Sequence, residues 1–378
     1  MKLVDSFADV SRFVRLRRDI HAHPELGFEE HRTSEIVAGL LREWGIEVHT
    51  GVVGVLRCGD GARTIGLRAD LDALPLQEEN RFPHRSTHDG RMHACGHDGH
   101  TTMLLAAAWH LAQSRDFSGT VNFIFQPAEE MGKAGALKMI QDGLFERFPC
   151  EAVFALHNFA LGDKGKPGDF ALNEGALMAS SNTWRVTMVG RGTHASLPHT
   201  GLDPVGAVID LGQQLQALVP RVIDSTERAL LAVTQIQGSD APNVIPDQAW
   251  VGGTVRTFSE RATDAIEAGL RRLADGIAAA HGCKAEVFFR RASPPVVNHA
   301  AEARFAAAVM GAEDFAHMLR VRPGCYAFIG NGDGAHRLPD HGPGPCIIHN
   351  TSFDFNDAII PVGASYFVRL VQRWLAQP

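Results

Sequence analysis

Residues 93–100 read His-Ala-Cys-Gly-His-Asp-Gly-His, and Pro-Ala-Glu-Glu occupies residues 127–130 directly after an apolar run. Thiolate, imidazole and carboxylate side chains are the groups that bind a zinc-like ion. Cys95 and His97 lie close enough in the sequence to serve one metal centre. One of the adjacent glutamates, Glu129 and Glu130, could bind metal, which would leave the other free as a base. The two motifs therefore indicate two halves of a metal site.

The elements that must position these motifs alternate between helical and strand-like patterns. Helical periodicity within residues 11–46 is broken at the His23-Pro24-Glu25 step. Further along come a strand at 64–71, a helix at 100–114, a strand at 121–125, a helix at 137–143 and a strand at 152–156. Such an alternation predicts an α/β layered sheet.

Polar residues follow three of these predicted strands. Asp70 and Asp72 end the first, Glu129 and Glu130 follow the second, and His157 ends the third. Taken singly, each is more often a helix cap or a solvated side chain. Ligands in open α/β sheets bind at the carboxyl ends of the strands. A shared site therefore explains the combination of Cys95, His97, Glu129, Glu130 and His157 better than five separate surface roles.

The middle of the chain has a different order of elements. Each predicted helix there has a strand on either side. The elements come in the order strand 183–189, helix 205–219, strand 230–236, strand 250–257, helix 263–281 and strand 285–290. This β-α-β-β-α-β order predicts a ferredoxin-like α+β domain. Because the unit is self-contained, we expect it to be inserted at 183–292 into a catalytic domain formed by residues 1–182 and 293–378.

Composition narrows the range of partners. The 378 residues are 45% hydrophobic and 21% charged, as in a globular protein of two domains. A net charge of −7 that is spread along the chain gives no footprint for nucleic acid or an anionic membrane. The start of the chain is too polar for a signal peptide and six cysteines are scattered, so we expect a cytoplasmic protein without a disulfide framework.

The sequence resembles, nearly end to end, the dinuclear metal amidohydrolases that include hippurate hydrolase, indole-acetyl-amino-acid hydrolases and N-acyl-amino-acid deacylases. Eight ordered motifs carry the resemblance, and they are too many for coincidence. They are His-Ala-His-Pro-Glu-Leu-Gly-Phe at 21–28, Leu-Arg-Ala-Asp-Leu-Asp-Ala-Leu-Pro at 67–75, Met-His-Ala-Cys-Gly-His-Asp-Gly-His at 92–100, Gln-Pro-Ala-Glu-Glu at 126–130, Ala-Leu-His-Asn at 155–158, Thr-His-Ala-Ser-Leu-Pro-His at 193–199, Asn-Val-Ile-Pro-Asp at 243–247 and Gly-Thr-Val-Arg-Thr-Phe at 253–258.

The resemblance implies a metallopeptidase-like α/β/α catalytic domain with an inserted lid and dimerisation domain, and two divalent ions per subunit. The implied ligands are Cys95, His97, Glu130, His157 and His349, with Cys95 bridging the ions. Spacing alone does not favour His349 over His341, which we expect to be solvated together with His336. Zinc or manganese is expected, while cobalt and nickel also accept such mixed ligands.

The same resemblance implies that Glu129 is the general base, which takes a proton from a metal-activated water and returns it to the leaving amine. Asp70 and Asp72 would accept the free N–H of metal-bound imidazoles, although a strand-end cap explains Asp70 equally well. We interpret His93 and His100 as structural or as supports of the ligands.

Three residues of the inserted domain match substrate-binding positions of the family: His194, Asn243 and Arg256. Arg256 would hold the substrate carboxylate in a bidentate fork, and His194 would stabilise the developing oxyanion. The resemblance implies that this histidine reaches the partner subunit's active site, which requires a homodimer or a tetramer built from it. Without the match, all three would be read as polar surface residues.

The expected activity is hydrolysis of an N-acyl amino acid to a carboxylate and a free amino acid. The alternatives are a dipeptidase or carboxypeptidase with the same metals, a metal-binding relative without turnover, and a dimerisation scaffold. The intact base, Glu129, favours catalysis. Met178, Phe315 and the 330–345 loop are candidates for the acyl pocket.

This chain differs from the family between Val309 and Met310, where relatives have a further helix end, a strand and a loop. Loss of these elements would expose core surface, so we expect that the printed sequence omits them.

Overall fold

The computed structural model describes residues 3–49, 52–159, 166–307 and 320–377. The junction between Val309 and Met310 and the candidate Phe315 lie outside these residues. The chain divides into two compact units, one formed by residues 1–177 and 297–378 and the other by residues 178–296.

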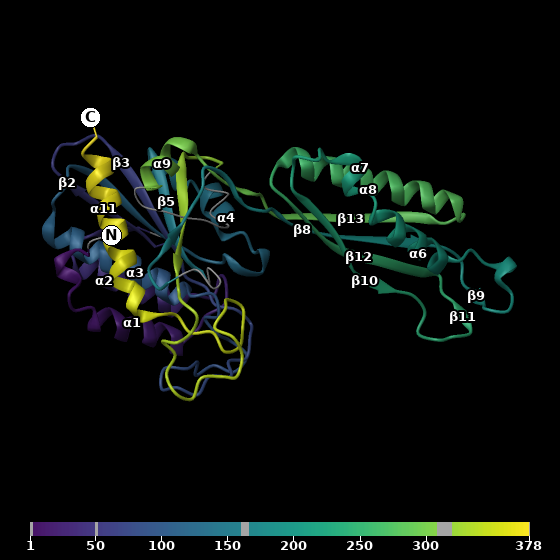
Figure 1. The fold of residues 1–378 in the computed structure, drawn as a ribbon, viewed down its shortest axis with the longest axis horizontal. Coiled ribbons are helices and arrows are strands. Elements are labelled where there is room, and N and C mark those ends of the chain that lie inside the picture. The colour runs from purple at the N-terminus through teal and green to yellow at the C-terminus, as the bar shows by residue number, and fades with distance from the viewer. Residues whose placement is uncertain (1–2, 50–51, 160–165, 308–319, 378) are drawn as a thin grey trace. The chain divides into compact units, whose positions relative to one another are not determined.

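The described part of the first unit contains a seven-stranded sheet in the order β1-β2-β4-β3-β5-β15-β6 (Figure 1). Strands β4, β3, β5 and β15 are mutually parallel, whereas β1, β2 and β6 are antiparallel to their neighbours. The sheet confirms the predicted α/β fold class. Its strands are β1 Glu47–His49, β2 Val53–Cys58, β3 Thr64–Asp70, β4 Gly119–Gln126, β5 Ala152–Phe159, β6 Phe170–Ala171 and β15 Gly324–Gly330.

The helices of this unit pack on the sheet. Helix α3 (His97–Ser114) is buried along most of its length and contacts β3, α1 and α11. Its short alanine side chains at positions 106–108 allow this close packing. The other helices are α1 Ser11–Ala22, α2 His31–Glu43, α4 Gly135–Gln141, α5 Leu144–Arg147, α9 Ala300–Ala307 and α11 Ile360–Leu375, with 3-10 turns at Asp5–Phe7, Glu130–Gly132 and Asp357–Ile359.

The parallel strands bring the predicted site residues to one edge of the sheet. Asp70 at the end of β3 pairs in register with Gln126 at the end of β4, and β5 and β15 end in register at Phe159 and Gly330. The loops that follow these carboxyl ends, together with the start of α3, therefore share one rim, where ligands of open α/β sheets bind.

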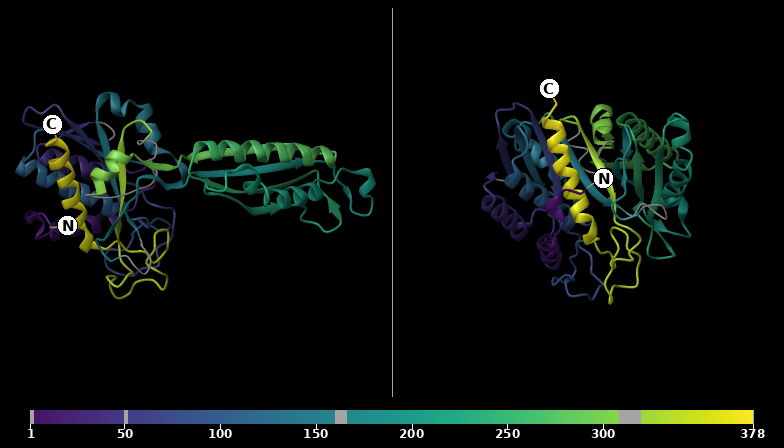
Figure 2. Two further views of the ribbon diagram at one scale, coloured as in Figure 1. Left: turned by 45° about the horizontal axis from the view of Figure 1, so that its top comes forward. Right: turned by 60° about the vertical axis from the view of Figure 1, so that its left-hand side comes forward.

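The second unit is a four-stranded antiparallel sheet in the order β10-β12-β8-β13, with α6 and α8 packed on one face (Figures 1 and 2). Numbered within the unit, this is the 4-1-3-2 order of a ferredoxin-like domain, as expected. Its elements are β8 Ser181–Val189, β9 Thr193–His194, η4 Pro198–Thr200, α6 Pro204–Leu215, α7 Val219–Val222, β10 Ala229–Gln237, β11 Val244–Ile245, β12 Gln248–Thr257, α8 Glu260–Ala280 and β13 Lys284–Ser293.

Local sequence explains where these helices begin and end. The side chains of Asp203 and Ser259 cap the N-termini of α6 and α8 by accepting backbone N–H groups. The predicted single helix at 205–219 is wrong at its end, because α6 stops at Leu215 and a separate turn, α7, contains Pro220. Proline has no backbone N–H to continue the hydrogen-bond ladder of a helix but is tolerated in a first turn, so Pro220 stands at the start of α7 rather than within α6.

Two short strands, β7 (Gly175–Met178) and β14 (Val296–Asn298), pair where the chain passes between the two units. In the described ranges, no helix has both the length and the apolarity to cross a membrane. The six cysteines are free thiols, and Cys95, Cys150, Cys325 and Cys346 are buried.

Candidate active site

The first motif turns from a loop into helix α3 at the rim of the sheet. Gly96, the residue before the helix, has φ +91°, and a Cβ there would lie 2.1 Å from the Asn158 Oδ1 atom. Glycine is therefore required both for the left-handed conformation and for the close approach to β5. This turn buries Cys95 and His97 next to the end of β5.

All five predicted metal ligands lie close together in the first unit. The Cys95 Sγ atom is 3.4 Å from His157 Nε2, and Glu130 Oε1 is 3.2 Å from His349 Nε2 and 3.9 Å from His97 Nε2. Cys95 belongs to two groups whose ligand atoms lie within 4.8 Å of one another, one with His97 and His157 and one with Glu130 and His349. Membership of both groups is what a bridging thiolate requires.

Unsatisfied buried atoms show that this donor set fits a cation. Within the described ranges, the two ring nitrogens of His97 and Glu130 Oε1 make no hydrogen bond of acceptable geometry, and their approaches to Asp72 and His349, at 3.3 Å and 3.2 Å, are ion-pair contacts only. Buried polar atoms are normally bonded. Burial alone would lower the pKa of His97, but the nearby carboxylates of Asp70, Asp72 and Glu130 raise it well above its usual value. The site thus concentrates negative charge around an imidazole, an arrangement that a divalent cation would neutralise.

Asp72 links the histidine to the second motif. Its Oδ1 lies 3.3 Å from His97 Nδ1 and accepts the backbone N–H of Glu129 at 3.0 Å, and its Oδ2 accepts that of Glu130 at 2.9 Å. Glu129 is half-buried, and its carboxylate belongs to a further group of potential ligand atoms with His97 and Glu130. One aspartate therefore fixes both halves of the site relative to each other.

Asp70 makes a separate chain of contacts rather than a helix cap. It accepts from Arg68 at 2.7 Å and lies 2.6 Å from His100 Nδ1, while its Oδ2 is 3.7 Å from His97 Nε2. The other ring nitrogen of His100 accepts the Asn158 backbone N–H at 3.1 Å. Both ring nitrogens of His100 thus contact protein groups, as expected of a residue that supports the ligands.

A buried ionic cluster, which sequence reasoning missed, lies next to the metal loop. Arg17 contacts Asp98 at 3.4 Å and Asp354 at 3.2 Å, and its Nε donates to Asp357 at 2.8 Å. His21 bridges Asp98, at 2.9 Å, and Glu78, at 3.2 Å.

Burial would lower the pKa of His21, but hydrogen bonds to Asp98 and Glu78 raise it to about 10. Asp98, the residue after the predicted ligand His97, is thus tied to helix α1 and, through Arg17, to the C-terminal segment. The signal was present in the sequence: Arg17 and His21 are four residues apart on the helical face that also carries Phe13 and Ile20.

His336, predicted to be solvated, is half-buried and lies 3.1 Å from the Asp354 backbone oxygen. That prediction is wrong because the 330–345 loop folds back on the segment after it. His341 is exposed, as expected.

In the second unit, His194 and Asn243 are neighbours on a two-stranded ribbon. His194 pairs with Val244 in register, and the Ala195 backbone N–H donates to the Asn243 carbonyl at 2.9 Å. The Ser196 backbone N–H donates to His194 Nδ1 at 3.1 Å. When the ring is neutral, this bond places its proton on Nε2, the nitrogen that remains available to donate.

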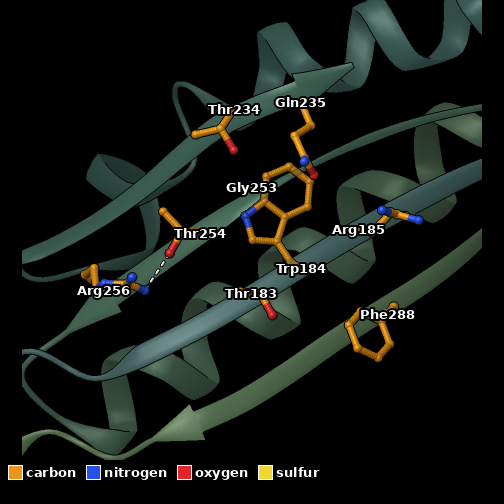
Figure 3. A pocket seen from close by; sticks show the side chains of 9 residues that line it. All are labelled: Thr183, Trp184, Arg185, Thr234, Gln235, Gly253, Thr254, Arg256 and Phe288. Atoms are coloured by element: carbon orange, nitrogen blue, oxygen red, sulfur yellow. Dashed lines mark hydrogen bonds between the residues drawn. The ribbon is translucent and has the colours of Figure 1, made fainter. Parts of the chain in front are cut away.

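Arg256 lies on β12 beside a cavity of about 680 Å³ that is also lined by Thr183, Thr254 and Phe288 (Figure 3). Its guanidinium donates to the Thr254 hydroxyl and to the carbonyls of Asn182 and Val255. Partial burial lowers its pKa. Among the described residues it pairs with no carboxylate, so its charge is available to a ligand.

The sequence matches Peptidase family M20/M25/M40 over residues 66–373. The chain belongs to this family. Together with the clustered donors at the sheet rim, this membership makes the protein an amidohydrolase.

Individual relatives are similar in sequence to this chain over nearly its whole length. Hippurate hydrolase of Campylobacter jejuni is 37% identical, over 99% of this chain and 100% of that protein. N-acetylcysteine deacetylase of Bacillus subtilis is 36% identical, over 95% and 96%. The crystal structure of the Bacillus subtilis YXEP protein, a dinuclear metal binding peptidase from the M20 family, has a TM-score of 0.79 and 33% identity, covering 97% of this chain and 98% of that one. The predicted resemblance is confirmed.

Proposed function

We propose that the protein hydrolyses the amide bond of N-acyl amino acids, releasing a carboxylate and a free amino acid. The observation that carries this proposal is the cluster of Cys95, His97, Glu130, His157 and His349, with the Glu129 carboxylate beside it. Relatives that act on hippurate and on N-acetylcysteine support this substrate class.

Cys95, His97, Glu130, His157 and His349 would hold two divalent ions, zinc or manganese, with Cys95 as the shared ligand. When bound, the ions would polarise the amide carbonyl and acidify the attacking water. Glu129 takes the proton from that water and delivers it to the leaving nitrogen. Asp72 holds the Glu129 backbone and the His97 ring in place, and Asp70 adds negative charge beside the same ring.

The second unit would bind the substrate. His194 exposes its Nε2–H, a donor suited to an oxyanion, and Asn243 is its neighbour on the same ribbon. Arg256 would receive the carboxylate of the amino acid part, because its guanidinium has no acidic partner among the described residues. This unit would serve as lid and dimerisation domain, with His194 acting in the partner's site.

Mixed dimers test the action of His194 in trans. One subunit carries His194→Ala and the other Glu129→Gln, and the two are co-expressed with different affinity tags. Action in trans leaves one competent site in each mixed dimer, with about half of the wild-type kcat per dimer. Action within one subunit leaves both sites defective, so an inactive mixed dimer would contradict the proposal.

The function itself is tested by elemental analysis together with a panel of N-benzoyl, N-acetyl, N-indoleacetyl and long-chain acyl amino acids, with dipeptides as the competing class. The expected result is about two ions per subunit and release of amino acid that stops on chelation and returns when metal is added. Cleavage of dipeptides alone would replace the proposal by a peptidase function. A metal-loaded but inert protein would contradict it.

A further inference from the structure

The loop that carries Glu129 has an unusual backbone. Ala128, Met131 and Ala134 have φ values of +54°, +59° and +58°. These are left-handed conformations that residues with a side chain rarely adopt. They persist only where the surroundings hold them, and such residues gather at functional sites. Ala128 directly precedes Glu129, so its conformation sets the direction in which the proposed base leaves the sheet.

Three consecutive backbone N–H groups of this loop are held by two buried carboxylates. Asp72 accepts those of Glu129 and Glu130, at 3.0 Å and 2.9 Å. The third, from Ala128, donates to Glu30 Oε1 at 2.7 Å. Glu30 is only 5% exposed and comes two residues after the His-Ala-His-Pro-Glu-Leu-Gly-Phe motif at 21–28. Two carboxylates therefore hold the loop that carries Glu129, here called the base loop, and one of them, Glu30, comes from the N-terminal segment.

The N-terminal segment is itself fixed against the loop. The Glu25 carboxylate accepts the backbone N–H groups of Arg32 and Thr33, at 2.9 Å and 2.8 Å, which anchors the start of α2. Lys133 of the base loop donates to the Gly27 carbonyl at 2.6 Å. A Cβ at Gly27 would lie 2.9 Å from the Ala128 Cα atom. The backbone of Gly27 and the side chain of Glu30 thus both contact the same residue, Ala128.

We propose that Glu30 is a positioning residue for Glu129, because it holds Ala128 in the left-handed conformation that aims the Glu129 carboxylate. This inference rests on the proposed function of Glu129 as the base. Glu30 acts through the backbone and touches neither the substrate nor the metal ligands. Its loss should therefore lower kcat while KM and metal content stay the same.

Three variants separate this role from a general structural one. Glu30→Ala removes the acceptor, whereas Glu30→Gln keeps an oxygen at the same place. Burial and the neighbouring Asp72 raise the pKa of Glu30 to about 7, so a neutral side chain is compatible with the position. Glu29→Ala is the matched control, since the adjacent Glu29 is exposed and pairs with Arg91 at 3.0 Å.

The measurements are kcat and KM on the best N-acyl amino acid, metal per subunit, and hydrogen exchange of the amides at 128–130. We expect Glu30→Ala to lower kcat about 10- to 100-fold, as small misplacements of a catalytic group do. KM should stay within about twofold of wild type, both metals should remain and the Ala128 amide should exchange faster. Glu30→Gln should restore most of kcat, and Glu29→Ala should match wild type.

Gly27→Ala pushes on Ala128 from the other side and keeps the Glu30 carboxylate. It should lower kcat with metal retained, and it decides the question if Glu30→Ala does not fold. Unchanged kcat in Glu30→Ala, or in Gly27→Ala, would overturn the proposal, as would a loss of kcat that follows loss of metal. If the wild type hydrolyses no N-acyl amino acid, the proposed function fails, while hydrogen exchange at residue 128 still decides whether Glu30 holds the loop.

Discussion

In the first unit the candidate ligands Cys95, His97 and His157 are buried, whereas in the second unit His194 and Asn243 are exposed. The carboxylates of Asp70, Asp72 and Glu130 lie 3.3–3.9 Å from the buried His97 ring. The exposed group makes few contacts of its own beyond the ribbon that carries it. Burial strengthens electrostatic interactions, so the first set suits the proposed metal ions, whereas the exposed second set has few protein contacts and would be ordered by the proposed substrate.

The largest loss of activity should come from Glu129→Gln, a change in the first unit. Removing a general base costs about 10²- to 10⁴-fold in rate. Metal content and melting temperature should stay at wild-type values, because the carboxamide keeps the size of the side chain and the ligands are untouched. Steady-state kinetics and elemental analysis check this, and retained activity would remove Glu129 from the role of base.

Cys95→Ala should remove the ability of the first unit to bind metal. A bridging ligand serves both ions, so metal content should fall, and with it the stabilisation that bound metal gives the folded state. The melting temperature should then no longer respond to a chelator, unlike that of wild type. Cys58→Ala is the control, since this half-exposed thiol donates to the Arg115 carbonyl far from the rim. Unchanged metal content would refute the bridging role.

Arg256→Met tests the second unit with a smaller expected loss. A hydrogen bond between charged groups contributes about 1.5–3 kcal/mol, which corresponds to a rise in KM of about 10- to 160-fold with kcat largely preserved. Arg185→Met is the control, because Arg185 lines the same cavity but stacks on Trp250 at 4.0 Å. Equal effects of the two variants would show that the positive charge of this sheet face matters, and not a bidentate contact of Arg256 with the substrate carboxylate.

His21→Gln should have the smallest effect on catalysis, and its effect should be visible instead as pH-dependent stability. The pKa of His21 is raised from 6.5 to about 10. Its protonated form therefore stabilises the folded state fully below pH 6.5, and this contribution is lost as the pH rises through 10.

The melting-temperature gap between the metal-free wild type and His21→Gln should be wide at pH 6 and narrow towards pH 10. His281→Gln, which removes a surface contact to Asp210, should leave a small gap at every pH. A gap for His21→Gln that does not change with pH would count against the charged state of His21.

Sequence reasoning predicted the residues whose partners are near in the chain. The spacing of Cys95 and His97, and that of Glu129 and Glu130, indicated a metal site. Strand periodicity placed Asp70 and His157 at strand ends, which is correct for Asp70, whereas β5 continues beyond His157 to Phe159. Arg17, His21 and Glu30 were missed because their partners lie 57–340 residues away. Local patterns do not specify such pairings, which only the packing of α1 and α2 against the rim creates. For the same reason, spacing could not separate His349 from His341.

The bond between Arg17 and Asp357 spans 340 residues, and the whole second unit lies between them in the sequence. During synthesis at about 5–20 residues per second, roughly ten to fifty seconds pass between the appearance of Asp98 and that of Asp357. The second unit, which is one continuous segment with its own core, can fold within this interval. The first unit must wait with Arg17 lacking two of its carboxylate partners. The unit that carries the chemistry is therefore the last to be completed as the protein leaves the ribosome.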